Sequence, residues 1–172
     1  MNIPSLSVRI VLSGLLLTGL LFLTSCAQPD PSEDLKPLVD RYVRAWNTGD
    51  LNGLEEVVSL QFELRMSPRF NAVRSLDSLK SSITYWRTAY PDFHINVDEV
   101  IYAPDAVTAR WTIRATNSGP GSHPPTGKAV LVPGMSIIHV SAGKIVDEWI
   151  SANDLYWAEQ LGFALAPTSP SK

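Results

Sequence analysis

Residues 124–163 read PPTGKAVLVPGMSIIHVSAGKIVDEWISANDLYWAEQLGF, and this stretch decides the fold. Its first four residues cannot continue a strand, because proline has no amide hydrogen to donate and glycine favours turns. We expect a strand over 135–140, a hairpin turn at 141–143 and a partner strand over 144–152. A short helix follows. Two long antiparallel strands closed by a helix predict a curved sheet with a covered concave face, which tends to hold a pocket.

Helices dominate the N-terminal half of the domain. Apolar residues recur at helical spacing over 35–46, and Gly49 ends this predicted helix. A short second helix over 51–58, capped by Asp50, and a strand over 61–66 come next. Ser75 then caps a third helix, whose apolar stripe ends at Trp86.

Two more strands lie between the third helix and the decisive stretch. Residues 93–97 and 107–116 alternate, and in the second strand Trp111 shares the apolar face while Arg110 and Arg114 share the polar one. The polar face can meet solvent, a subunit interface or a ligand. The order of elements predicts an α+β cone, in which three N-terminal helices pack on the concave face of a strongly curved antiparallel sheet, with a short C-terminal helix.

Short motifs of the decisive stretch resemble the SnoaL-like polyketide cyclase (ester cyclase) branch of the NTF2-like superfamily. The motifs are Pro125-Thr126-Gly127-Lys128, Gly143-Lys144-Ile145-Val146-Asp147-Glu148-Trp149, Asp154 and Gln160-Leu161-Gly162. The junctions at 45–50 and 91–93 are similar to the same family. The resemblance covers roughly residues 35 to 163. It implies an NTF2-like cone with a hydrophobic pocket and a homodimer formed through the outer sheet face.

Composition narrows the class of protein. The chain has 172 residues, a formal net charge of −3 and 45% hydrophobic residues, which fits one globular domain behind a processed leader. Nucleic-acid binding usually needs a basic face, so we expect no nucleic-acid partner. The three histidines and the single cysteine have no metal-site spacing, and no phosphate-binding glycine loop appears. We therefore expect neither a metal nor a cofactor.

The N-terminus has the pattern of an exported protein. An apolar run over 10–23 is short for a membrane span and suits a signal peptide, with an uncleaved anchor helix as the alternative. Leu23-Thr24-Ser25-Cys26 resembles the bacterial lipobox, which implies cleavage before Cys26 and its acylation. We therefore expect a signal peptide over 1–25, a tether over 26–34, the domain over 35–165 and a disordered tail over 166–172. The domain would then lie outside the cytoplasm, lipid-anchored to a membrane of the bacterial cell envelope.

The candidate catalytic residues are three acids and one histidine. The resemblance implies an acid/base aspartate on the strand after Pro-Thr-Gly, but residues 129–132 contain no carboxylate. A carboxyl group in an apolar pocket has a raised pKa and can exchange protons near neutrality. The remaining candidates are Asp147, Glu148, Asp154 and His123. The alternatives are salt bridges for the first two, a helix N-cap for Asp154 and a solvated loop position for His123.

The expected pocket lies between the third helix and the sheet. Its candidate ligand-binding residues are Arg65, Trp86, Tyr90, Arg110, Trp111 and Trp149, with a solid aromatic core as the alternative. Two functions remain open. One is a noncatalytic module that binds a small hydrophobic ligand or a partner at the cell envelope, which the missing aspartate favours. The other is a cofactor-free acid/base enzyme, of the cyclase or isomerase type, acting on a small carbonyl compound.

Overall fold

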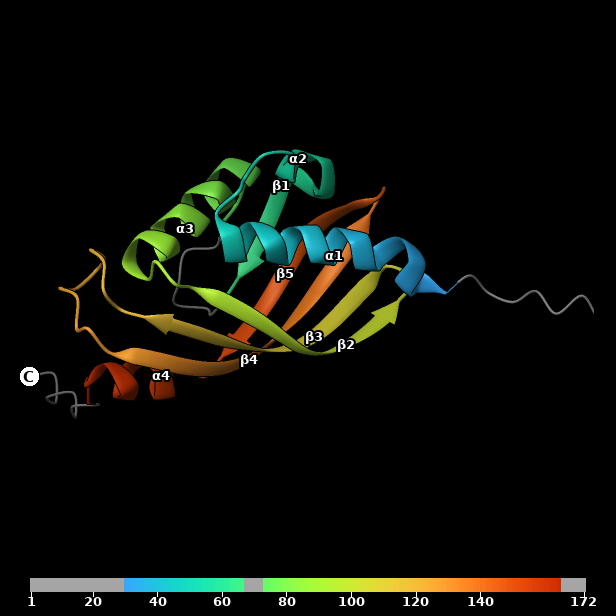
Figure 1. The fold of residues 1–172 in the computed structure, drawn as a ribbon. Coiled ribbons are helices and arrows are strands. Elements are labelled where there is room, and N and C mark those ends of the chain that lie inside the picture. The colour runs from blue at the N-terminus through green and yellow to red at the C-terminus, as the bar shows by residue number, and fades with distance from the viewer. Residues whose placement is uncertain (1–29, 67–72, 165–172) are drawn as a thin grey trace, which may run out of the picture.

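The computed structural model describes residues 30–66 and 73–164. The predicted signal peptide, Cys26 and the predicted tail lie outside the described residues. The elements are α1 (Pro31–Thr48), α2 (Leu54–Val57), β1 (Val58–Arg65), α3 (Leu76–Ala89), β2 (His94–Ala103), β3 (Ala106–Thr116), β4 (Ala129–Ser141), β5 (Lys144–Ala152) and α4 (Asp154–Leu161). Figure 1 shows α1, α2 and α3 on one side of a curved sheet, while α4 packs against β4. The predicted α+β cone is confirmed.

The sheet has five strands in the order β1-β5-β4-β3-β2. The pairs β2–β3, β3–β4 and β4–β5 are antiparallel. The prediction of a wholly antiparallel sheet is wrong at one edge, because β1 pairs with β5 in parallel. Hairpins force antiparallel pairing only between strands that follow each other closely, and most of the domain separates β1 from β5.

Local capping explains most of the helix boundaries. Asp30 accepts a hydrogen bond from the Ser32 amide at the start of α1, and Gly49, with φ of 73°, ends that helix. The Ser75 hydroxyl accepts from the Ser78 amide, as predicted for α3. The second helix is shorter than expected and begins after Gly53. The alternative role of Asp154 as an N-cap is wrong, since Asn153 caps α4 through its bond from the Tyr156 amide.

Strand β4 is longer than predicted and passes through Pro133. The pairing of β4 with β5 ends at Gly134, so the missing amide hydrogen of Pro133 falls where the ladder already stops. The Pro133 carbonyl accepts a bond from the Asn153 amide, 3.2 Å away. The strand is therefore continuous although it contains a proline.

Beside the first part of β4, the side chain of Gln160 takes the hydrogen-bonding place that a neighbouring strand would fill. The Leu131 amide donates to Gln160 Oε1 at 2.8 Å, and Gln160 Nε2 donates to the Leu131 carbonyl at 3.1 Å. Two bonds of this kind satisfy backbone groups that β5 no longer reaches. The glutamine of the Gln-Leu-Gly motif thus joins α4 to the sheet.

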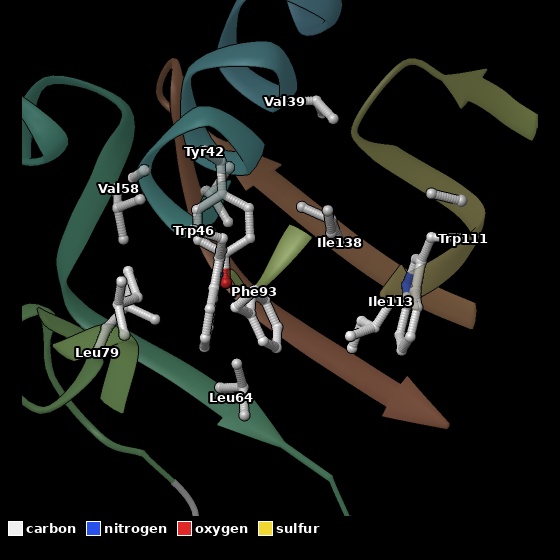
Figure 2. Close-up of a cluster of buried hydrophobic side chains, with 14 of the residues drawn as sticks. Val39, Tyr42, Trp46, Val58, Leu64, Leu79, Phe93, Trp111, Ile113 and Ile138 are labelled. Atoms are coloured by element: carbon white, nitrogen blue, oxygen red, sulfur yellow. The ribbon is translucent and has the colours of Figure 1, made fainter. Parts of the chain in front are cut away.

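The hydrophobic core lies between the helices and the concave face of the sheet. In Figure 2, Tyr42 and Trp46 extend from α1 towards Phe93 and Leu64, while Trp111 and Ile113 lie next to each other at the other side of the cluster. Phe62, Leu79 and Ile83 are fully buried in the same layer. This layer surrounds the candidate site.

Candidate functional site

An apolar cavity lies inside the core, between α1, α3 and the concave face of the sheet. Its volume is about 70 Å³. We call it the inner cavity. Apolar and aromatic side chains make most of its wall, with Trp111 and Ile138 from the sheet and Trp86 from α3. The aromatic rings therefore form a core that retains a small hollow, which combines the two alternatives predicted for them.

One carboxyl group reaches the inner cavity, that of Glu148. The residue lies on β5, is only 5% exposed and faces inward beside Ile150. The Tyr42 hydroxyl of α1 donates a hydrogen bond of 2.6 Å to Glu148 Oε2. A buried acid without a cationic partner is costly unless hydrogen bonds support it, and here Tyr42 supplies one.

Further polar residues of the sheet support Glu148. The Trp111 indole N–H donates to the Ser136 hydroxyl at 2.9 Å, and the Ser136 hydroxyl acts to lower the pKa of the neighbouring Glu148 carboxyl. Gly134 makes room for this arrangement, because a Cβ at that position would lie 2.2 Å from a Trp111 ring carbon. Trp111 thereby fixes the Ser136 hydroxyl on the wall of the cavity that Glu148 also lines.

Burial dominates the electrostatics of the pair. It raises the pKa of Glu148, and the hydrogen bonds from Ser136 and Tyr42 offset this only in part. Burial and the neighbouring Glu148 together raise the pKa of Tyr42 well above its ordinary value. The pair therefore holds its protons more tightly than the same groups would in water.

A second, larger hollow adjoins the inner cavity near α4. This outer pocket has a volume of about 340 Å³ and is lined by Tyr90, His123 and Asp154 among others. Asp154 lies at its rim, and partial desolvation by surrounding protein raises the pKa of its carboxyl. The ring of His123 packs against that of Phe163, with the two ring centroids 5.1 Å apart. Two of the candidate catalytic residues thus lie at the outer pocket and not beside Glu148.

Four candidates lie on the outer face of the sheet, so their predicted place in the pocket is wrong. Successive residues of a strand point to opposite faces, and the inward Glu148 leaves Asp147 and Trp149 outward. Asp147 Oδ1 lies 2.6 Å from His139 Nδ1, so its partner is a histidine and not the arginine of the salt-bridge alternative. Trp149 is 49% exposed, with the Arg65 guanidinium 5.4 Å from its ring centre. Arg110 pairs with Asp98 and Glu99 on this same outer face.

Several residues that build the site carry no recognisable signal in the sequence. Tyr42 belongs to the apolar stripe of α1, and nothing in its spacing signals a polar role. Ser136 and Trp157 gave no signal either. Asn117 is 1% exposed, and its side-chain oxygen accepts from the Thr126 amide at 2.8 Å. That contact fixes the loop carrying His123, and nothing in the sequence signals it.

The described part of the chain shows no group of His, Cys, Asp or Glu side chains that could hold a metal ion. Within the same residues, no helix combines the length and apolar character needed to cross a membrane.

A family model for SnoaL-like polyketide cyclases matches residues 36–161. The chain belongs to this family. The SnoaL-like domain accordingly spans α1 to α4. Among curated proteins, none matches the chain.

Solved structures share the fold. AclR from Streptomyces galilaeus is 27% identical with a TM-score of 0.66, and the match covers 80% of this chain and 87% of AclR. TsrD from Streptomyces laurentii is 21% identical with a TM-score of 0.68, covering 76% and 96%. A SnoaL-like protein from Jannaschia sp. CCS1 is 16% identical with a TM-score of 0.70, covering 80% and 96%. The last two likenesses concern the fold alone.

Proposed function

We propose that this protein is a cofactor-free acid/base enzyme of the cyclase or isomerase type that acts on a small apolar carbonyl compound. One observation carries the proposal: the Glu148 carboxyl is buried in an apolar cavity, where a hydrogen bond from Tyr42 orients it. Membership of the SnoaL-like family supports it, because that family is described as polyketide cyclases.

The chemistry is proton transfer at a carbon next to a carbonyl group. Tyr42 occupies Glu148 Oε2, and the other carboxylate oxygen is the group that removes the α-proton. The electron pair of the broken C–H bond forms an enolate. Isomerisation follows when Glu148 returns the proton to a different carbon. Cyclisation follows when the enolate carbon attacks a second carbonyl, whose oxygen then takes the proton.

The apolar surroundings of Glu148 suit this role. Burial makes its carboxylate a stronger base than a solvated glutamate, since the raised pKa applies to the same proton that the substrate gives up. The aromatic walls also exclude water that would compete for the enolate. Asp154 and His123, at the outer pocket, are the secondary candidates for proton exchange.

A noncatalytic module that binds a small hydrophobic ligand is the second candidate function. The observation in its favour is that Tyr42 already holds the Glu148 carboxylate, in a cavity of only about 70 Å³. In that case Glu148 fixes the cavity wall and receives a ligand without reacting.

Exchange of α-protons for deuterium tests the proposal. The probe is 2-acetylnaphthalene, and NMR follows its methyl signal in D₂O with the parent protein, Glu148→Gln and Asp147→Asn. General base catalysis contributes roughly 10²- to 10⁴-fold, so Glu148→Gln should lose exchange by at least two orders of magnitude. Asp147→Asn is the matched control, a neighbouring acid on the outer face, and should keep the parent rate.

Tryptophan fluorescence of the same samples reports binding, because Trp86 and Trp111 line the inner cavity. Binding by the parent without exchange would support the noncatalytic module. Equal exchange by the parent and by Glu148→Gln would remove Glu148 as the base.

A further inference from the structure

The inner cavity is too small to hold a whole ligand. Its volume is about 70 Å³. An engineered apolar cavity that binds benzene has about 150 Å³, and a water molecule takes roughly 30 Å³ in the liquid. The inner cavity therefore accepts a group of about two or three heavy atoms. An acetyl group is of this size.

The outer pocket has the size that ligands need. Its volume of about 340 Å³ falls in the range of roughly 300 to 1,000 Å³ that is usual for small-molecule sites. The inner cavity and the outer pocket share three lining residues, Met66, Trp86 and Trp157. Because these three side chains line both hollows, we infer that they form the boundary between the two, and we call them the partition.

The partition is built from three different elements. Met66 follows the end of β1, Trp86 lies on α3 and Trp157 lies on α4. The rings of Trp86 and Trp157 are in contact, with centroids 5.0 Å apart. The Trp157 indole N–H also donates to the Tyr90 hydroxyl at 3.1 Å, in a buried position. That bond fixes the Trp157 ring, so among the described residues the width between the two hollows depends on these side chains.

The two hollows also differ in chemistry. The inner one ends at the polar pair Tyr42 and Glu148, whereas the outer one is rimmed by Ser122, His123 and Asp154 beside aromatic rings. A ligand that spans both hollows would present a small carbonyl group inside and a larger body outside.

We propose that Met66, Trp86 and Trp157 determine specificity by shape: they admit a carbonyl head group of about three heavy atoms to Glu148 and keep the ligand body in the outer pocket. The role of the carbonyl group rests on the proposed function, but the size selection does not. The ligand class is a compound with an unbranched terminal acetyl group on a body too wide for the partition.

Two probes that share one body test this proposal by backbone amide NMR. Naphthalene supplies the body alone, and 2-acetylnaphthalene adds the acetyl head. The amides of Ile138 and Ile150 report on the inner cavity, and those of Gly121 and Ala158 report on the outer pocket. With the parent protein, naphthalene should shift only the outer amides, and 2-acetylnaphthalene should shift both sets.

Smaller side chains in or beside the partition should let naphthalene reach the inner cavity. In Trp157→Phe the smaller ring should let naphthalene shift the inner amides as well. Tyr90→Phe keeps the ring volume but removes the acceptor of the Trp157 N–H, so it should have the same effect more weakly and covers the case in which Trp157→Phe fails to fold. Trp149→Phe is the matched control on the outer face, and its shift map should equal that of the parent.

The outcomes separate the two proposals. Inner shifts with naphthalene in the parent, outer shifts alone with 2-acetylnaphthalene, or no shifts at all would each overturn the size selection. The size selection would also be overturned if naphthalene shifts only the outer amides in both Trp157→Phe and Tyr90→Phe. Inner shifts with 2-acetylnaphthalene, without α-proton exchange, would leave the size selection standing and reject the proposed catalysis.

Discussion

Tyr42 and Glu148 lie 106 residues apart in the chain and are joined by a buried hydrogen bond of 2.6 Å. The bond connects the first helix to the strand at the centre of the decisive stretch. It gives the core a buried polar contact with a defined direction, from the phenol to the carboxylate. The position of α1 over the sheet and the orientation of the acid therefore depend on each other.

Glu148 should make the protein less stable as pH rises. Its pKa is raised in the folded state, so the folded protein keeps this proton after the unfolded chain has released it near the ordinary value of 4.5. The contribution of this group to the free energy of unfolding is fully present below about pH 4.5, and it is lost as pH rises through the folded pKa. In Glu148→Gln this fall should disappear. Free energies of unfolding from denaturant titrations between pH 4 and 8 measure it, and an equal pH slope in both proteins would contradict the assignment.

Gly134→Ala should dislodge Trp111. The added Cβ would lie 2.2 Å from the ring, too close for either group to stay in place. Overpacking of this kind costs about 1 to 3 kcal/mol of unfolding free energy. The NMR signal of the Trp111 indole N–H should also move, since its bond to Ser136 is lost. Met135→Ala, at the next position but on the outer face, should stay within about 0.5 kcal/mol of the parent.

Arg87→Lys should destabilise the junction between α1, α3 and β2. Arg87 Nη1 donates to the carbonyls of Trp46, Asn47 and Phe93, and Nη2 donates to that of Pro91. A lysine ammonium cannot reproduce this fork, so the loss should reach about 1.5 to 3 kcal/mol by chemical denaturation. The same substitution at the exposed Arg114 is the control. Equal effects at the two positions would mean that the fork contributes nothing.

We propose that Cys26 is acylated and anchors the domain at the cell envelope. The motivation is the lipobox-like Leu23-Thr24-Ser25-Cys26 after a short apolar run. Two or three acyl chains hold a protein on a membrane where one does not. Cys26→Ser should move the protein from the membrane fraction to the soluble fraction of bacterial cells that express it. Unchanged membrane association would reject the anchor, and Ser25→Ala serves as the neighbouring control.

The homodimer through the outer sheet face stays a prediction.

Much of the fold could be predicted because its signals are local. Apolar stripes at helical spacing predicted α1 and α3, and strict alternation predicted β3. The turn at Ala142 and Gly143, both with positive φ, joins β4 to β5 as expected. The parallel edge formed by β1 could not be predicted in this way, because pairing between distant strands leaves no mark on either strand alone.

The site was harder to predict for a physical reason. Both faces of β5 carry apolar residues, so alternation could not tell whether Asp147 or Glu148 points inward. A tryptophan is expected in the core because its side chain is large and aromatic, yet Trp149 is exposed. The Arg65 side chain lies over its ring and covers part of it. Tyr42 looked like another core residue, since its hydroxyl matters only once Glu148 lies opposite.

The parallel pairing of β1 with β5 has a consequence for how the chain reaches its final shape. The hairpin of β4 and β5 closes through a short turn, whereas β1 must wait for a partner synthesised more than eighty residues later. Until then β1, against which α3 packs, lacks its partner strand, which leaves part of the N-terminal half exposed to aggregation. Early termination before β5 should therefore yield an insoluble fragment, while the acid of the cavity is placed among the last events of folding.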